Sequence, residues 1–404
     1  MNILVLAGSS DQAALIIELK KRKNNIILVD YLQNPIAKRY VDKHFVTSTL
    51  DIDSVRDIAI REKVDLITTA CTDQALLTAA KISEEIKLPC YISYQTALNV
   101  TNKSYMKEIL SKNDIPTAKY IISDATIPKC INDFTFPLVV KPVDCNSSKG
   151  VRKVISLNEL KEYLHCAVSM SRSETAIIEE YKNGEEISAD FYIQNGIVKL
   201  LLVTGSYKIQ NSNSFTILQS YYPAVSENEE LTISNIAQKI ACAFNLVNTP
   251  MLLQLIKTQN SFYVIEFSAR IGGGSKYKLI EKLTGVNIMN VYIDLIMGLI
   301  PHVSPEKRYN HALMNYVYCN PGLFHELQNF ETLKETHIID DFFHYKTGGM
   351  EIINAEISSD RAAGFLILGN DKHDVISRLC TADKELKVID QNGNDIMKHG
   401  LYAY

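Results

Sequence analysis

Hydrophobic positions in the first hundred residues alternate between short continuous runs and runs with helical spacing. Ile3 to Ala7 is wholly apolar, as expected for a strand that is covered on both faces. Gln12 to Lys21 then has the spacing of an amphipathic helix, with Ser10 or Asp11 as its cap. The pattern continues with strands over 26–29, 44–46 and 66–69 and helices over 55–62 and 73–81. This alternation predicts an α/β unit with a doubly wound parallel sheet.

The pattern changes after about residue 98. A helix over 103–112 ends before Pro116, and short strands rich in Val, Ile and Tyr then run to about residue 205. One helix, over 157–170, interrupts them, so this segment is predicted to form a small α+β unit. Two further strands are expected over 251–257 and 262–267, followed by helices to residue 300. The last hundred residues mix strands and helices and contain no clear chemical motif.

The composition narrows the class of protein. A chain of 404 residues is long enough for two or three packed domains, and 46% hydrophobic with 22% charged residues is typical of globular proteins. A net charge of −4 gives no general attraction to nucleic acid or to an anionic membrane. We therefore expect neither partner, and any binding of a polyanion must come from a local cluster of charge.

Cysteine usage and hydropathy predict a cytoplasmic protein. None of the eight cysteines lies in a C-x-x-C pair, which favours reduced thiols over disulfides or a zinc site. The apolar N-terminal run has no basic residue before it, so a signal peptide is not expected. The longest candidate for a membrane span, Ile288 to Val303, is interrupted by Asp294 and Pro301.

Four segments carry the candidate chemistry. In chain order they are Lys103 at a helix start; Lys141 after an apolar strand, with the loop 144–151; Glu179, Glu180 and Lys182 after another apolar strand; and Gln254 on one strand with Glu266 and Arg270 on the next, before Gly272 to Gly274. Each segment alone has an ordinary alternative, such as a solvated strand end or a plain loop. Their order and spacing together argue for one site.

Elementary chemistry suggests what that site binds. Lys141 ends a strand that could not bury its charge unless an anion met it, and Ser and Gly in the following loop let backbone N–H groups approach a phosphate. Glu179 and Glu180 can accept hydrogen bonds from a ribose or an adenine amino group. The 12 residues between Gln254 and Glu266 suit a hairpin with both side chains on one face, and their oxygens suit magnesium.

Together these segments resemble the ATP-grasp superfamily, whose members include the carbamoyl phosphate synthetase large subunit, biotin carboxylase, glycinamide ribonucleotide synthetase and dipeptide-forming amino-acid ligases. The resemblance implies a Rossmann-like domain over 1–97 that binds no dinucleotide. It further implies a split ATP-grasp domain over 98–300 with a mobile flap over about 116–181, and a small C-terminal α+β domain over 301–404.

The same resemblance implies a role for each residue of the site. Lys103 and Lys141 would hold the α and β phosphates of ATP; Ser147, Ser148 and Gly150 would form the phosphate loop; Glu179, Glu180 and Lys182 would read the adenine; and Glu186 would hold the ribose. Gln254 and Glu266 would bind Mg²⁺, with Mn²⁺ as an alternative metal, and Ser268 stands where many relatives have an asparagine ligand. Arg270 would face the γ-phosphate, and Arg270 and Lys141 would be the catalytic pair.

The implied reaction is ligation. A small-molecule carboxylate would become an acyl phosphate, and an amine would then displace phosphate, so that ADP and phosphate are released. The acceptor is expected between the first domain and the glycine loop, where the candidates are Ser9, Ser10, Asp73 and Lys276; each suits a helix cap or a solvated side chain equally well. A homodimer is expected only by analogy with relatives.

Two other classes of nucleotide-binding protein can be recognised by their sequence motifs. Ala7-Gly8-Ser9-Ser10-Asp11 does not match G-x-G-x-x-G, which argues against a nicotinamide dehydrogenase, and the P-loop pattern is absent from the sequence. A non-catalytic ATP-binding sensor, suggested by Ser268, and a bicarbonate-activating carboxylase or carbamoyl-type enzyme stay open. His337, Asp340, Asp341 and His344 fit no strong metal motif, and a solvated role is expected for them.

Overall fold

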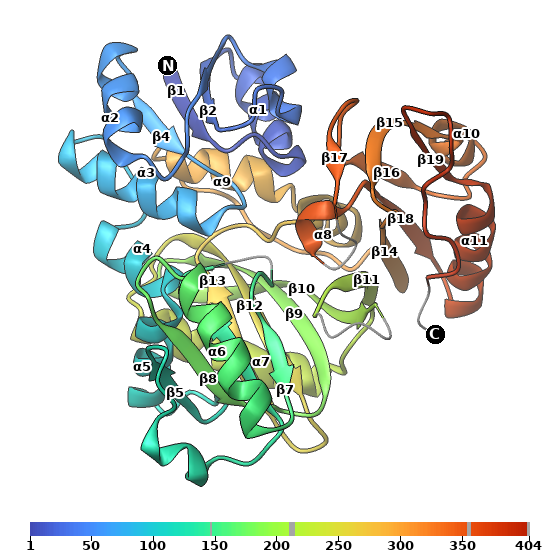
Figure 1. The fold of residues 1–404 in the computed structure, drawn as a ribbon. Helices are drawn as coiled ribbons and strands as arrows, with labels where there is room; N and C mark the ends of the chain where they lie inside the picture. Colours follow the sequence, from blue (N-terminus) through green and yellow to red (C-terminus); the bar gives the residue numbers. More distant parts are fainter. Residues whose placement is uncertain (146–147, 210–214, 354–356, 402–404) are drawn as a thin grey trace.

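The first unit of the computed structural model is a four-stranded parallel sheet with helices on both faces (Figure 1). The structure describes residues 1–145, 148–209, 215–353 and 357–401. The strands are β1 (Asn2–Leu6), β2 (Asn25–Asp30), β3 (Lys43–Val46) and β4 (Leu66–Thr68), in the order β3-β2-β1-β4. The helices are α1 (Ser10–Lys21), α2 (Ile52–Arg61) and α3 (Asp73–Glu85). The predicted doubly wound parallel sheet is confirmed.

The continuous apolar run of β1 is explained by two separate cores. Ile3 and Val5 pack with α1 and with α9 (Ile288–Ile296), whereas Leu4 and Leu6 pack with α2 and α3. Successive side chains of a strand point to opposite faces, so a sheet that is covered on both sides needs an apolar residue at every position.

The second unit is a small antiparallel sheet covered by one helix. It comprises β5 (Tyr120–Ser123), β6 (Leu138–Pro142), β7 (Arg152–Val154) and β8 (Ala176–Glu180), in the order β5-β8-β6-β7. α6 (Leu157–Met170) packs on it through Leu160 and Leu164, and in Figure 1 this helix crosses in front of the strands. The segment is reached through α4 (Tyr94–Thr101) and α5 (Lys103–Lys112). The predicted helix over 157–170 is therefore confirmed.

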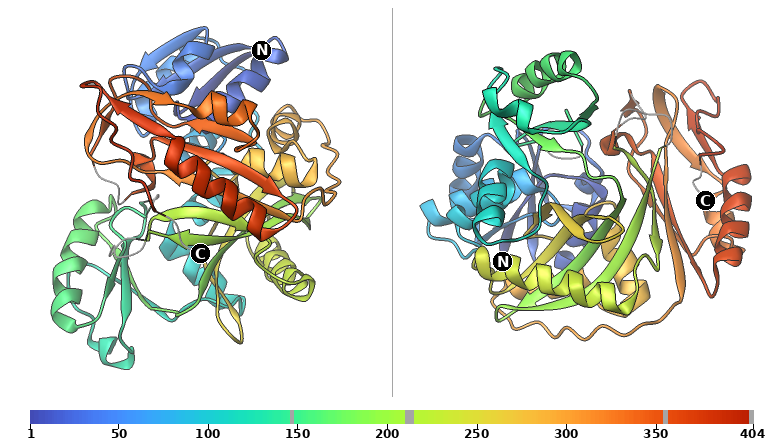
Figure 2. Two further views of the ribbon diagram at one scale, coloured as in Figure 1. Left: turned by 90° about the vertical axis from the view of Figure 1, so that its right-hand side faces the viewer. Right: turned by 90° about the horizontal axis from the view of Figure 1, so that it is seen from below.

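The largest sheet has eight strands and continues past residue 300. Its order is β13-β12-β9-β10-β11-β14-β18-β16. The bounds are β9 (Glu185–Gln194), β10 (Ile197–Lys208), β11 (Ile217–Tyr222), β12 (Thr249–Lys257), β13 (Phe262–Ser268), β14 (His311–Val317), β16 (Asp341–His344) and β18 (Ala363–Gly369). α7 (Glu227–Ala243) covers one face, as the right view of Figure 2 shows. The division at residue 300 stays a prediction about domains, but the β11–β14 ladder crosses it.

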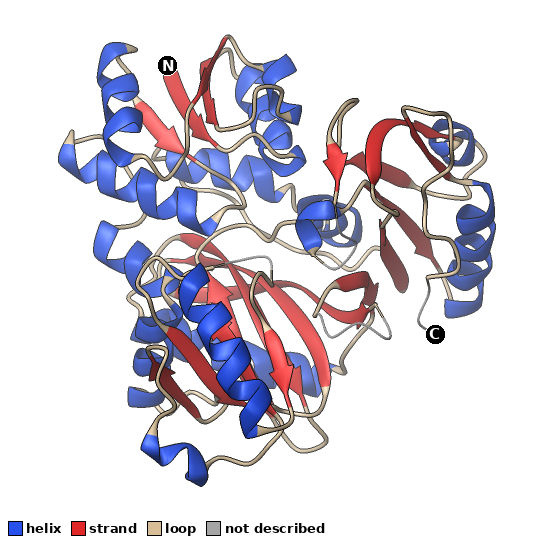
Figure 3. Cartoon of the chain, viewed as in Figure 1, coloured by secondary structure: helices blue, strands red, loops and turns tan. Residues whose placement is uncertain are grey.

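The C-terminal part adds a second layer with its own core. It contains a three-stranded sheet of β15 (Gly322–Gln328), β17 (Glu351–Ile352) and β19 (Lys387–Asp390), together with α10 (Phe330–Glu335) and α11 (Lys372–Glu385). α8 (Lys276–Thr284) and α9 join it to the first unit, and Figure 3 shows the mixture of helix and strand throughout. Of the histidine–aspartate group, Asp340 pairs with Arg378 and Asp341 with Lys334. Among the described residues, no helix is long and apolar enough to cross a membrane.

Candidate active site

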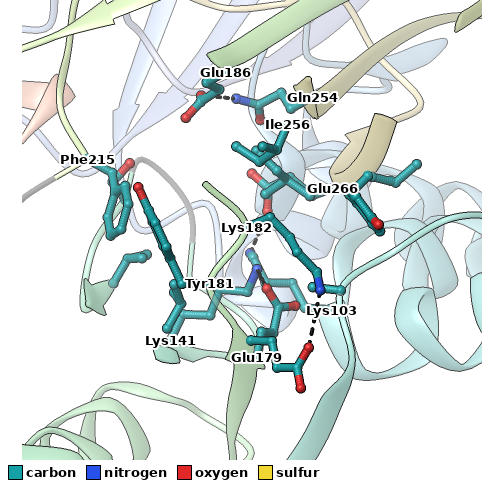
Figure 4. A pocket seen from close by; sticks show the side chains of 18 of the residues that line it. Lys103, Lys141, Glu179, Tyr181, Lys182, Glu186, Phe215, Gln254, Ile256 and Glu266 are labelled. Carbon is teal, nitrogen blue, oxygen red and sulfur yellow. Dashed lines mark hydrogen bonds and ion pairs between the residues drawn. The ribbon is translucent and has the colours of Figure 1, made fainter. Parts of the chain in front are cut away.

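A single cavity between the small antiparallel sheet and the large sheet collects most of the predicted binding residues (Figure 4). Nine of them line it: Lys103, Lys141, Ser148, Glu179, Glu180, Lys182, Glu186, Gln254 and Glu266. Seven of them come from α5, the small sheet, β9, β12 and β13, which are far apart in the sequence, and Ser148 and Lys182 lie in the loops before β7 and β9. Three predicted residues, Gly150, Ser268 and Arg270, are not among the lining residues. Ser147 lies outside the described residues.

Two lysines share one carboxylate on the floor of the cavity. Glu179 Oε2 is 3.0 Å from Lys141 Nζ, and Glu179 Oε1 is 3.0 Å from Lys107 Nζ. All three side chains are at least nine-tenths buried. Burial alone would raise the pKa of Glu179, but the two ammonium groups outweigh it and hold this pKa at about 2. Glu179 is therefore ionised at neutral pH and holds both lysines in place.

Lys107 is a residue of this site that the motif comparison missed. It also donates to Thr117 Oγ1 at 2.5 Å and to the Val264 carbonyl at 3.2 Å. Burial lowers its pKa to about 8, although Glu179 acts in the opposite direction. The signal that could have revealed Lys107 is its position four residues after Lys103, because residues four apart on a helix share one face. A lysine on that face has to point toward the same cavity.

Lys103 joins the floor of the cavity to the candidate metal ligands. Its Nζ is 3.2 Å from Glu266 Oε2 and donates to the Cys145 carbonyl at 2.6 Å. Burial would lower the pKa of Lys103, but Glu266 outweighs burial, so the pKa is raised. Asn102 caps α5 through its side chain and thereby fixes the position from which Lys103 extends. The Lys103 ammonium therefore stays charged at neutral pH.

Gln254 and Glu266 face each other across two neighbouring strands. The register of β12 and β13 pairs these two residues directly, so the predicted hairpin with both side chains on one face is confirmed. Gln254 Nε2 donates to Glu186 Oε1 at 3.4 Å, and Glu186 Oε2 is 2.8 Å from Lys208 Nζ. The side-chain oxygens of Gln254 and Glu266 are hard metal ligands, and Lys103, a predicted phosphate-binding residue, lies beside them. This donor set fits Mg²⁺ that is carried by a nucleotide and keeps part of its water.

Apolar and aromatic side chains form part of the lining of the cavity. Tyr181, Phe215, Ile256 and Tyr263 line it, and Lys182 Nζ lies over the Tyr263 ring at 5.0 Å from its centroid. Lys182 is also paired with Glu180 at 3.2 Å. Flat apolar walls with one amine and one carboxylate at the edge suit a planar heterocycle such as a purine.

Arg270 lies outside the lining and is held by the first unit. Its Nε and Nη2 donate to the two carboxylate oxygens of Asp73, at 2.8 and 2.5 Å. Burial would raise the pKa of Asp73, but Arg270 outweighs it and, with a hydrogen bond from Ser268, keeps it low. Both predicted residues therefore meet Asp73 at the start of α3. Their proposed roles toward a phosphoryl group and a metal stay predictions.

The acceptor candidates are spread around the glycine loop, residues 272–274. Lys276 is buried, donates to Thr204 Oγ1 at 2.7 Å and lies 3.5 Å from Asp190 Oδ2; burial lowers its pKa. Ser9 is the N-cap residue of α1 without a capping side-chain hydrogen bond, and Ser10 begins that helix. The residue that contacts the loop is instead Asp11, which accepts from the backbone N–H groups of Gly274 and Ser275.

Other residues of the chain bind and cover the backbone of the turn after β1. Asp30 accepts from the N–H of Gly8 and from that of Leu32, both at 2.7 Å. Pro35 packs so closely on Gly8 that a Cβ there would lie 2.6 Å from it. The acidic residue that a dinucleotide's ribose would need is therefore bound to its own loop, in agreement with the absence of the glycine fingerprint.

A parallel sheet, a small antiparallel sheet and a large sheet surround a cavity lined by lysines, as the resemblance to the ATP-grasp superfamily implies. Residues 134–277 match the family model described as ATP-grasp domain. The chain contains an ATP-grasp domain, and the resemblance inferred from its motifs is confirmed.

The chain is also similar in sequence to individual proteins of known activity. It is 28% identical over 171 residues to the carbamoyl phosphate synthase large chain of Caldanaerobacter subterraneus subsp. tengcongensis, covering 40% of this chain but only 15% of that protein. It is 21% identical over 332 residues to the L-arginine-specific L-amino acid ligase of Bacillus subtilis, covering 75% of this chain and 77% of that protein.

Solved structures show the same fold over almost the whole chain. An L-amino acid ligase from Bacillus licheniformis has a TM-score of 0.79 at 21% identity and covers 97% of this chain and 99% of its own. The biotin carboxylase domain of Hydrogenobacter thermophilus 2-oxoglutarate carboxylase, solved with MgADP and bicarbonate, has a TM-score of 0.78 at 15% identity and covers 99% of this chain and 92% of its own.

Proposed function

We propose that this chain is an ADP-forming carbon–nitrogen ligase that activates a small-molecule carboxylate with ATP and joins it to an amine. The observation that carries this proposal is the convergence of Lys103, Lys141 and the Gln254–Glu266 pair on one cavity. Two of the proteins that the chain matches over most of its length are ligases of amino acids, which supports the same class of reaction.

The charge balance of the cavity supports a nucleotide that arrives with a divalent metal. Among the described residues, five lysines and four glutamates line it, a formal excess of one positive charge. A nucleoside triphosphate carries about four negative charges, so the protein alone leaves most of them uncompensated. Gln254 and Glu266 would hold Mg²⁺ or Mn²⁺, with Ser268 as the third candidate, and the bound metal would neutralise phosphate charge.

The other predicted site residues would each hold one part of the nucleotide. Lys103 and Lys141 would hold the α and β phosphates, Ser148 and Gly150 belong to the loop that would cover them, and Glu186 would hold the ribose. Glu180 and Lys182, at the apolar wall, would read the adenine edge. The flap would close over the phosphates and exclude water, which would otherwise hydrolyse the activated carboxylate.

The chemistry requires two displacements. A carboxylate oxygen of the first substrate attacks the γ-phosphorus and ADP leaves; the amine of the second substrate then attacks the carbonyl carbon, phosphate leaves, and a proton is lost from the nitrogen. Arg270, fixed by Asp73, would stabilise charge on the transferring group.

The test is ADP release with Mg-ATP against carboxylates and amines, each alone and then in pairs, with bicarbonate among the carboxylates. We expect release that requires both partners and is lost in Lys141→Ala. Release with bicarbonate alone would indicate a bicarbonate-activating enzyme. No release with any pair, despite tight ATP binding, would contradict the ligase proposal.

A further inference from the structure

Arg361 differs from Arg270, which also lies near the glycine loop, because no described carboxylate forms a direct ion pair with it. It follows η3 (Ser358–Asp360) and precedes β18, and its guanidinium lies flat over Tyr316, 3.6 Å from the ring centroid. Nε donates to Tyr318 Oη at 3.0 Å, and Nη2 is 3.4 Å from the Ile217 carbonyl and from Ser358 Oγ. All these acceptors are neutral. Within the part of the chain that the structure describes, no carboxylate lies within 4.0 Å of Arg361.

The third nitrogen of Arg361 faces the glycine loop. A Cβ added to Gly274 would lie 2.9 Å from Arg361 Nη1 and 2.8 Å from Tyr316 Oη, so the loop passes directly over both groups. Tyr316 Oη donates to the Gly274 carbonyl at 3.0 Å. No described residue accepts a hydrogen bond from Nη1. One N–H edge of a fixed arginine therefore lies beside the loop without an acceptor among the described residues.

The same loop connects Arg361 to the predicted reaction centre. Gly274 lies four residues after Arg270, and its N–H is held by Asp11 of the first unit. Tyr345 Oη donates to Ser275 Oγ at 2.9 Å, which adds a further polar group at this end of the loop. Asp11 is the acid whose charge interacts with Arg361, but it forms no direct ion pair with it and already accepts from two backbone N–H groups. An arginine cannot give up its proton, so a partly buried guanidinium without a directly paired acid favours a further anion.

The chemistry of that anion follows from the guanidinium. A planar fork matches a carboxylate through two parallel hydrogen bonds, whereas the phosphates already have the lysines of the nucleotide cavity. The carboxylate that is activated loses its own charge when it becomes an acyl group. The permanent charge of Arg361 is therefore better matched by a carboxylate that stays ionised throughout the reaction. A carboxylate on the amine substrate meets this condition.

We infer that Arg361 binds the free carboxylate of the amine substrate beside Gly274, and hence that this substrate is an amino acid. This inference rests on the proposed ligase function and specifies its second substrate. It makes Arg361 a specificity-determining residue and not a contributor to phosphoryl transfer.

The test compares an amino acid with its carboxamide as the amine substrate, in the wild type and in Arg361→Met. We expect the wild type to prefer the free acid by at least about tenfold in kcat/KM, the effect of one charge-assisted hydrogen bond. Arg361→Met should lose that preference by raising KM for the acid, with KM for ATP and the rate with the carboxamide unchanged. Arg61→Met is the matched control, because Arg61 also stacks on a ring, that of Phe45, but on α2.

An equal loss with acid and carboxamide, or no change in their ratio, would overturn the inference while leaving the ligase proposal intact. If Arg361→Met does not fold, as judged by circular dichroism, Arg361→Lys replaces it; this variant keeps the charge without the fork and should retain part of the preference. If no pair releases ADP, calorimetric binding of amino acid and carboxamide to the wild type and the variant with MgADP still decides. Equal affinities for the two compounds would then overturn it.

Discussion

In the nucleotide cavity each of the five lysines has a carboxylate partner. At the glycine loop, by contrast, the described groups that Arg361 stacks on or donates to are tyrosines, a serine and a carbonyl. Paired lysines keep a fixed geometry when the site is empty, and a metal-bound nucleotide needs little extra positive charge. An unpaired guanidinium instead gives selectivity for a small anion. The difference suggests that nucleotide binding depends on preorganised geometry and acceptor selection on one uncompensated charge.

The largest effect is expected from the acid that two lysines share. Glu179→Gln would leave Lys107 and Lys141 buried without a counter-charge, and removal of one member of a buried ion pair costs about 3–5 kcal/mol. Urea unfolding followed by circular dichroism measures this, because the chain has no tryptophan. Glu180→Gln is the control: its pair with Lys182 is about one-quarter exposed, and the loss should stay below about 1 kcal/mol. Equal losses in both variants would contradict a structural role for the buried triad.

The same carboxylate predicts a pH dependence. The pKa of Glu179 is about 2 when folded and 4.5 when unperturbed, so its stabilisation is complete above pH 4.5 and disappears as the pH falls toward 2. The difference in free energy of unfolding between the wild type and Glu179→Gln should therefore shrink by up to about 3 kcal/mol over this interval. A difference that does not change with pH between 7 and 3 would exclude this account.

Measurements of ATP turnover distinguish a role of Lys141 in phosphate binding from its structural role in the buried group of Lys107, Lys141 and Glu179. Lys141→Ala should lower ATP turnover at least about 100-fold, about 2.7 kcal/mol, because a preorganised phosphate contact is lost. The fold should persist, since Glu179 keeps its 3.0 Å pair with Lys107. Steady-state ADP release together with circular dichroism measures both. Unchanged turnover in a folded variant would refute the assignment.

A pair of glycines tests the region around Arg361. Gly274→Ala would place a Cβ within 3 Å of Tyr316 and Arg361, whereas Gly196, with a similar positive φ, has open space around its Cβ position. Both variants carry the same backbone strain, about 1 kcal/mol or more, so their difference isolates the contact. We expect a further loss of about 1–3 kcal/mol for Gly274→Ala only, and a raised KM for the amine substrate. Equal behaviour of the two variants would mean that the loop does not depend on Arg361.

Much of this architecture could be predicted because local patterns determine it. The apolar run of β1 and the hairpin pairing of Gln254 with Glu266 are set by strand periodicity, which the sequence displays directly. α4 was not predicted. Its N-cap is Ser93, whose side chain accepts from the Thr96 N–H, and its eight residues bury only Ala97, Val100 and Thr101, too few for a clear hydrophobic period. Capping chemistry rather than hydrophobic spacing defines that helix.

The parts of the site that the sequence did not reveal depend on contacts between distant segments. Lys107 meets Glu179 across 72 positions of the chain, and Asp11 meets Gly274 across 263. Arg361 lies in a segment that reads as an ordinary turn, and nothing local shows that its guanidinium stacks on Tyr316. No spacing rule links residues that only the tertiary fold brings together. From the sequence alone, a single charged residue in a loop can only be interpreted as solvent-exposed.

The ladder between β11 and β14 has a consequence for the evolution and engineering of this chain. Four residue pairs, from Gln219–Asn315 to Tyr222–Ala312, join the strands on either side of residue 300. A chain that stopped at that point would leave β11 as an exposed edge with unpaired backbone groups, which favours aggregation. The last hundred residues therefore cannot be exchanged like an independent module. Recombination with another protein is better tolerated at a joint that no sheet crosses, such as the segment between α3 and α4.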